Sequence, residues 1–136
     1  MSWYDRDQQG KLRLVREYMA MKETAPDFVL KRKLDHKLFW EGIVTTEKSV
    51  YQLEIRYTEC FPSDPPDVYV KSPELPRNTP HLWDNQKLSL FDPWYAKKAG
   101  YYNPGTTTAA TMRVHAINWL LAFEVWRAIG IWPDVH

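Results

Sequence analysis

The chain has 136 residues, of which 44% are hydrophobic and 26% are charged. This length and composition are typical of one globular domain that can bury a core without disulfides. The net charge of +1 excludes the strong positive field with which a protein attracts a polyanion. We therefore expect a single domain over residues 1–136 and no nucleic-acid partner.

The cysteine and histidine content limits which disulfides and metal sites the chain can form. Cys60 is the only cysteine, so it cannot form an internal disulfide, which fits a reducing compartment. The histidines lack metal-ligand spacing with one another or with Cys60; they are His36, His81, His115 and His136. The N-terminal residues do not resemble a secretory signal, and no apolar run could span a bilayer. We expect a cytoplasmic protein with no metal, no cofactor and no membrane association.

An amphipathic helix is predicted over residues 8–22. Leu12, Val15 and Met19 recur at helical spacing and predict the buried stripe. Three further apolar residues widen it: Leu14, Tyr18 and Met21. Charged residues on the other side predict a solvated face, or alternatively a docking face for a protein partner; they are Lys11, Arg13, Arg16, Glu17 and Lys22.

Four strands are predicted next, over residues 27–34, 38–45, 51–57 and 68–70. Residues 51–57 alternate apolar and polar side chains, which is typical of a strand with one buried face. Short connections predict an antiparallel meander, because parallel neighbours need long crossovers. The fold class is therefore α+β.

The remainder of the chain contains a proline-rich crossing, a long loop and a closing helix. Prolines in the segment 60–66 cannot pair in a sheet. We expect Cys60 there to be a small buried or half-buried residue, with a reactive thiol as the alternative. The loop over 71–105 is long enough to be functional. Thr106, Thr107 or Thr108 can cap a helix that runs to about Ile129. This helix is apolar on most sides, so we expect the sheet and the long loop to cover it.

The candidate site lies in the loop stretch 80–91, where Ser89 stands in a short apolar run eight residues after His81. Ser89, His81 and either Asp84 or Asp92 could form a hydrolase triad, although nearness in sequence does not give their orientation.

The order of elements and two local patterns resemble the ubiquitin-conjugating enzymes. The block from Tyr57 to Pro66 is similar to the family's Tyr/Phe-Pro-x-x-Tyr/Phe-Pro-x-x-Pro-Pro strand end, with Thr58 in place of the first proline. His81 matches the histidine of the family's His-Pro-Asn turn, and Leu88-Ser89-Leu90 matches the segment that carries the thioester cysteine. The shorter spacing and the tryptophan-rich ending look most like the bacterial branch associated with antiphage signalling operons.

The resemblance implies a ubiquitin-conjugating fold and a set of site residues. Position 89 would carry a protein C-terminus as a (thio)ester, with His81 and Asn85 as further catalytic residues. The implied substrate groove consists of Trp83, Leu88, Leu90, Asp92 and Trp94. The implied partner is a ubiquitin-like modifier or a cyclic-nucleotide synthase, with an activating enzyme as a further candidate partner.

Two departures from the family pattern leave the activity open. Leu82-Trp83 replace the Pro-Asn of the turn, so Asn85 or backbone amides are the remaining groups for an oxyanion. Ser89 replaces the cysteine, and a serine hydroxyl needs an adjacent base where a thiolate does not. Three alternatives follow: a conjugating enzyme with a substituted cysteine, a natural inactive protein that binds a partner, or a structural serine in an unrelated domain.

Overall fold

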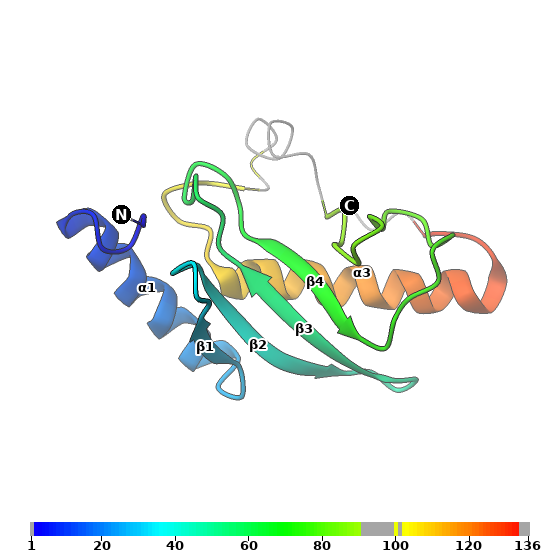
Figure 1. Ribbon diagram of the computed structural model, residues 1–136. Helices are drawn as coiled ribbons and strands as arrows, with labels where there is room; N and C mark the ends of the chain where they lie inside the picture. The colour runs from blue at the N-terminus through cyan, green and yellow to red at the C-terminus, as the bar shows by residue number, and fades with distance from the viewer. Residues whose placement is uncertain (1, 91–99, 101, 134–136) are drawn as a thin grey trace.

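The computed structural model describes residues 2–90, 100 and 102–133 and confirms the predicted order of elements (Figure 1). The elements are α1 (Gln8–Thr24), β1 (Val29–Arg32), β2 (Leu38–Thr45), β3 (Val50–Arg56), β4 (Asp67–Ser72) and α3 (Ala109–Ile129). Within the described part of the chain, no helix is long and apolar enough to cross a membrane.

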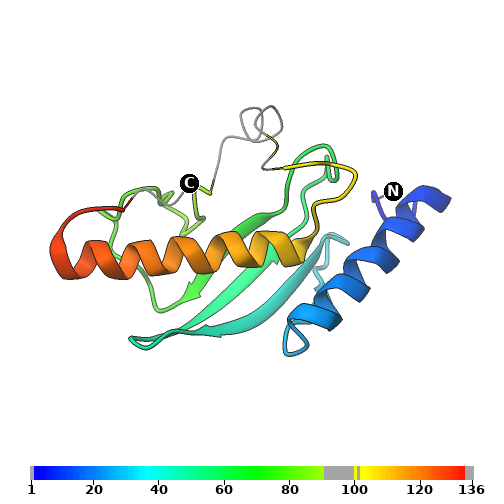
Figure 2. The same ribbon diagram turned by 180° about the vertical axis from the view of Figure 1, so that it is seen from behind.

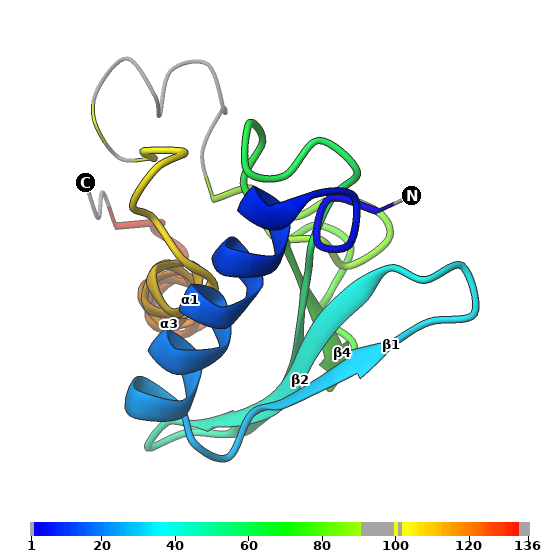
Figure 3. The same ribbon diagram turned by 90° about the vertical axis from the view of Figure 1, so that its left-hand side faces the viewer.

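The four strands form one antiparallel sheet in the order β1-β2-β3-β4, as the meander predicted. Leu53 and Ile55 of β3 are completely buried, which confirms the inward face that the alternation predicted. Gly42 of β2 is needed beside Phe28, because a Cβ at position 42 would lie 2.3 Å from the Phe28 ring. Figure 3 shows α1 and α3 on the same side of this sheet.

Both helices have well-defined ends. The Asp7 side chain accepts a hydrogen bond from Gly10 N at 2.8 Å and caps α1. At the C-terminal end of α3, Gly130 has φ 77° and donates its N–H to Trp126 O at 2.8 Å. A residue in this left-handed conformation is favoured as glycine, because it has no Cβ to clash.

The predicted orientation of α1 is wrong. Leu12, Val15 and Met19 are 56%, 59% and 61% exposed, whereas Arg13 and Glu17 are 6% and 0% exposed. The supposedly solvated face therefore contributes an ion pair to the interior, and the apolar stripe faces outward. The reason is that Arg13 and Glu17 satisfy backbone groups of α3 and of the loop before it.

Glu17 is the centre of a buried polar network. Its Oε1 accepts hydrogen bonds from Tyr57 OH at 2.9 Å and from Ala109 N at 2.8 Å, and its Oε2 accepts one from Arg13 Nε at 3.1 Å. Tyr57 OH in turn accepts from Trp40 Nε1 at 2.9 Å. Burial and the Glu17 charge hold the pKa of Tyr57 well above its usual range, so this phenol remains a donor.

Arg13 extends the network to the loop that precedes α3. Its Nη1 donates to Pro104 O at 2.5 Å and its Nη2 donates to Thr107 O at 2.6 Å. The Glu17 carboxylate meanwhile lies at the first N–H of α3, where a negative charge is favourable. One ion pair therefore fixes α1, β3 and the start of α3 relative to one another.

Two further expectations are wrong. Cys60 is exposed, because the turn that contains it lies at the surface. The outer side of α3 is not covered as predicted: Val114, Leu121 and Val125 are 52%, 46% and 39% exposed. Figure 2 shows α3 in front of the sheet, with α1 beside its N-terminal end. The described part of the long loop instead contacts β4 through Lys87 and Leu88, α1 through Pro104, and the inward-facing Trp119 of α3 through His81.

Replacing Glu17 by glutamine should lower the free energy of unfolding by about 3 to 5 kcal/mol, because it leaves Arg13 as an unpaired buried charge. Urea unfolding followed by circular dichroism measures this. The matched control is Glu23→Gln, an exposed carboxylate on the same helix, which should change stability by less than about 0.5 kcal/mol. Equal effects of the two substitutions would contradict the central role of Glu17.

Candidate functional site

The stretch around position 89 is an additional hairpin at the free edge of β4. Leu82 pairs with Leu88, and Lys87 pairs with Tyr69 of β4. Leu88 N donates to Val68 O at 2.9 Å. Because Leu88 is only 4% exposed, its side chain anchors the hairpin in the core and its neighbour at position 89 faces outward.

The tip of this hairpin is a tight turn from Trp83 to Gln86. Gln86 N donates to Trp83 O at 2.9 Å, and Gln86 has φ 70°. Asn85 lies at the tip, where its Oδ1 accepts from Lys87 N at 3.3 Å. The Gln86 side chain holds the turn from behind, because Oε1 accepts from Leu75 N at 2.7 Å and Nε2 donates to Leu75 O at 3.2 Å.

Ser89 lies directly across the hairpin from His81. Ser89 N donates to His81 O at 2.9 Å, and both residues are exposed. His81 has φ 57°, a left-handed conformation that histidine adopts more readily than most residues. The backbone at position 89 is therefore fixed while its side chain is accessible to a partner.

The closing helix supports this pair from beneath. Trp119 of α3 donates its Nε1–H to His81 O at 3.1 Å, so this carbonyl accepts two hydrogen bonds. Trp132 packs against the His81 ring at 5.2 Å and against Trp119 at 5.1 Å between ring centroids. His81 thus has a clear role in the conformation of the loop.

A shallow depression of about 250 Å³ borders Ser89. It is lined by Pro65, Pro66, Asp67, Val68, Trp83, Lys87, Leu88, Ser89, Leu90 and Met112. Lys87 Nζ lies 3.9 Å from Asp67 Oδ1 and 5.4 Å from the centre of the Trp83 ring. Burial raises the pKa of the Asp67 carboxyl, while Lys87 and Arg56 oppose that shift. The depression combines largely apolar walls with one lysine and one aspartate that lie close to each other.

The structure brings together most of the predicted site residues and separates one of them. Ser89, Trp83, Leu88 and Leu90 line the same depression, and His81 pairs with Ser89. Asn85 lies at the hairpin tip, about three residue pairs or roughly 10 Å along the hairpin from the 81–89 pair. Asp92 and Trp94, predicted for the groove, lie outside the described residues, as does the use of Asp92 in a triad.

Sequence reasoning missed several residues that form the site. Pro65 and Pro66 predicted a stiff crossing, and the structure also makes them a wall of the depression. Trp119 was expected only to pack, yet its indole N–H holds His81. Gln86 carried no signal, because its partners on Leu75 are backbone groups eleven residues away.

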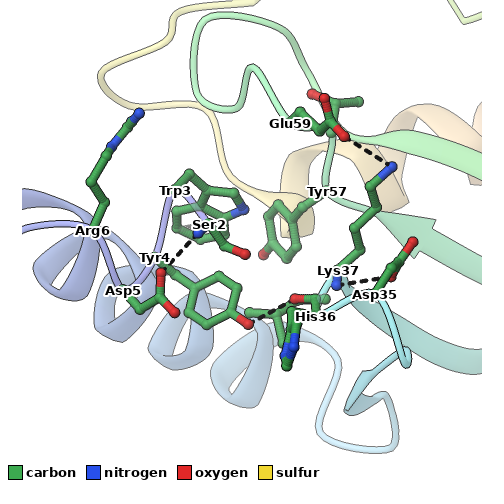
Figure 4. Close-up of a pocket in the computed structure, with 12 residues that line it drawn as sticks. Ser2, Trp3, Tyr4, Asp5, Arg6, Asp35, His36, Lys37, Tyr57 and Glu59 are labelled. Carbon is green, nitrogen blue, oxygen red and sulfur yellow. Dashed lines mark hydrogen bonds and ion pairs between the residues drawn. The ribbon is translucent and has the colours of Figure 1, made fainter.

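A second pocket, of about 440 Å³, lies between the start of α1 and the turn joining β1 to β2 (Figure 4). Trp3, Tyr4 and Tyr57 form its aromatic walls. Tyr4 OH donates to His36 O at 2.7 Å and ties the N-terminal segment to that turn. None of the predicted site residues lines this pocket. Within the described ranges, no group of three or more histidine, cysteine or acidic side chains could hold a metal ion.

Replacing Trp119 by phenylalanine should loosen the loop at position 89, because it removes the indole donor and keeps most of the packing. We expect a loss of about 1 kcal/mol in stability and faster hydrogen exchange at Ser89 N, measured by nuclear magnetic resonance. Trp126→Phe, on the same helix, is the matched control and should leave exchange at Ser89 unchanged. Unchanged exchange at Ser89 in Trp119→Phe would contradict the support by α3.

Comparison with known families identifies the chain. No curated protein and no solved structure gives a significant match. The family model for the Type II CBASS E2 protein matches residues 17–135, which is most of the chain and includes the hairpin and α3. The helix, meander and closing helix agree with an E2-like fold. The chain therefore belongs to the Type II CBASS E2 family, and it is an E2-like protein of bacterial antiphage defence.

Proposed function

We propose that this chain holds the C-terminal tail of a partner protein in the depression beside position 89, in the manner of a ubiquitin-conjugating enzyme. Membership of the family implies protein partners within a CBASS operon. Among these we propose the cyclic-nucleotide synthase as the owner of the tail, with a ubiquitin-like modifier as the alternative. In the enzymatic form of the proposal, the tail is carried as an ester or thioester at position 89 and passed to an acceptor.

The proposal rests on the structural surroundings of residue 89. Its backbone is held by His81 O, its side chain is exposed, and an apolar depression begins beside it. An extended tail can lie against Trp83 and the Pro65–Pro66 wall with its terminal carbonyl at position 89. Holding the reacting carbonyl and the attacking atom together supplies much of the rate of such a transfer.

The serine hydroxyl at position 89 limits how readily this chain can form an ester with a protein C-terminus. Attack by Ser89 Oγ requires a base to take its proton, and a cysteine thiolate does not. The His81 backbone has a structural role, and we assign no base to its ring. We therefore propose that the surroundings of position 89 are those of a transferase site. The serine at that position reacts too slowly for useful turnover.

The serine itself favours a second candidate, a protein-binding module without transfer. The depression keeps its binding features whatever atom stands at position 89. Trp83 is 58% exposed. Lys87, whose Nζ lies 3.9 Å from Asp67 Oδ1, could turn from this long ion pair toward a free C-terminal carboxylate. In this form the chain holds the tail noncovalently, and Asn85 only shapes the hairpin turn.

Substituting Ser89 by cysteine should restore covalent capture. We expect the variant to react with a thioester of the C-terminal peptide of the proposed partner, a cyclic-nucleotide synthase. The thiolate introduced at position 89 attacks the peptide carbonyl, a new sulfur–carbon bond forms, and the donor thiol leaves. Intact-mass spectrometry should show one added peptide that dithiothreitol removes.

The exposed Cys60 requires a matched background, because it could capture the peptide unselectively. The Ser89→Cys change is therefore made together with Cys60→Ser, and the unchanged chain with its lone Cys60 is the control. An adduct at position 89 of the double variant well above that on Cys60 of the control supports transfer. Equal reaction of both positions, or no adduct on a folded Ser89→Cys chain, contradicts it.

Replacing Trp83 by alanine should weaken binding of the free C-terminal peptide about tenfold or more, because an exposed aromatic at a groove is a frequent hot spot. Fluorescence anisotropy of a labelled peptide measures the dissociation constant. Leu34→Ala is the control, since Leu34 is fully exposed in the turn between β1 and β2. Unchanged affinity in Trp83→Ala, or equal losses in both variants, would contradict binding in this depression.

A further inference from the structure

Lys87 lies on the same face of the hairpin as Ser89. Leu88 N donates to Val68 O at 2.9 Å, on the side of β4. Ser89 N donates to His81 O at 2.9 Å, on the opposite side. Successive N–H groups that point in opposite directions are typical of an extended strand, in which side chains alternate between two faces. Because Leu88 is only 4% exposed, Lys87 and Ser89 both project outward, and both line the depression.

The spacing of these two residues lets the lysine amine reach a group attached at position 89. Residues two apart in a strand have Cα atoms about 6.6 Å from each other. Lysine carries its amine on a flexible four-carbon stem, which spans this gap. A carbonyl joined to the side chain of residue 89 is therefore within reach of Lys87 Nζ.

Two neighbours hold the Lys87 amine over the depression. Nζ lies 3.9 Å from Asp67 Oδ1 and 5.4 Å from the centre of the Trp83 ring. A charge-assisted hydrogen bond is about 2.7 to 2.9 Å long, so the longer contact with Asp67 leaves the amine able to turn. Burial raises the pKa of the Asp67 carboxyl, and a carboxylate with a raised pKa accepts a proton more readily than an exposed one. The amine thus has a proton acceptor beside it.

No other lysine in the described ranges lines this depression. Lys31 pairs with Glu41 at 2.8 Å between β1 and β2, at the far edge of the sheet from the hairpin. Lys71 of β4 is exposed and faces away from the depression's lining. An amine held beside a carbonyl reacts much faster than one that must collide with it from solution. Lys87 therefore has an advantage over the other described lysines.

We propose that Lys87 is the acceptor of the protein tail carried at position 89, so that the chain attaches the tail to itself. This inference rests on the proposed function, because it requires an ester or thioester at position 89. The neutral Lys87 amine attacks the terminal carbonyl carbon of the tail, and a nitrogen–carbon bond forms. The bond from that carbon to the oxygen or sulfur of residue 89 breaks, and the proton lost by the nitrogen passes by way of Asp67 to that leaving atom. The products are an amide on Lys87 and a free residue 89.

The amide product limits the reaction to one tail per chain. An amide is less reactive than an ester or a thioester, and the attached tail continues to fill the depression. A reaction that occurs once needs no turnover, so it is compatible with the slow hydroxyl of Ser89.

The test uses the Ser89→Cys, Cys60→Ser chain and the peptide thioester described above. The peptide should first add as a thioester that dithiothreitol removes. With time, an adduct of the same mass should appear that dithiothreitol does not remove, and tandem mass spectrometry of the digested chain should place it on Lys87. A thioester that stays fully sensitive to dithiothreitol, or a resistant adduct on another amine, overturns the inference and leaves the proposed function standing. The absence of any adduct on the folded chain overturns both.

Two lysine variants in the same background separate Lys87 from the other amines. Lys87→Arg keeps a cation opposite Asp67 but lacks the nucleophile, and it should lower the resistant fraction of the adduct about tenfold or more. Lys71→Arg is the matched control and should give the same resistant fraction as its parent. Circular dichroism establishes that both variants remain folded. Equal resistant fractions in the two variants would overturn the assignment to Lys87.

A further variant tests whether the tail passes through position 89. The Ser89→Ala, Cys60→Ser chain cannot form the thioester but retains Lys87. A resistant adduct that forms only in the Ser89→Cys chain supports transfer from position 89 to Lys87. An equal amount of resistant adduct in the Ser89→Ala chain means that the peptide acylates Lys87 directly, and this result overturns the inference.

Discussion

The buried carboxylate of Glu17 is the interaction on which the arrangement of this molecule depends. It accepts hydrogen bonds from Arg13, from Tyr57 OH and from the first N–H of α3. Burying a carboxylate without these donors would be costly, and the Tyr57 and Ala109 donors without it would be unsatisfied. The helix α1 therefore turns its ion pair inward even though this leaves Leu12 and Val15 exposed.

The position of α3 in turn determines the site. Its N-terminal end is fixed by Glu17, and two turns and more along the same helix Trp119 holds His81 O. His81 O also accepts from Ser89 N, so the rigid helix supports the backbone at position 89. The depression is then completed from the other side by Pro65 and the edge of β4. A site built this way keeps its shape whether the atom at position 89 is oxygen or sulfur.

The sequence allowed prediction of those features that depend on local pattern. The alternation in 51–57 correctly placed β3, and short connections correctly gave the meander. The face of α1 was mispredicted because Arg13 bonds to Pro104 and Thr107, more than ninety residues away, and no local pattern contains such partners. The hairpin that contains Ser89 was not predicted, since its hydrogen bonds also join backbone groups; the resemblance indicated only a turn and a segment for the reactive residue. The fold of this chain is therefore more predictable from sequence than the long-range hydrogen bonds that hold the candidate site.

We propose that the hairpin around position 89 holds a protein tail. Hydrogen–deuterium exchange of the chain, alone and saturated with the C-terminal peptide of a cyclic-nucleotide synthase, is the measurement that tests this. Slower exchange is expected in residues 81–90 and at Asp67 and Val68, with α1 and β1 unchanged. Protection confined to α1 or to the outer face of α3, with residues 81–90 unaffected, would contradict the claim.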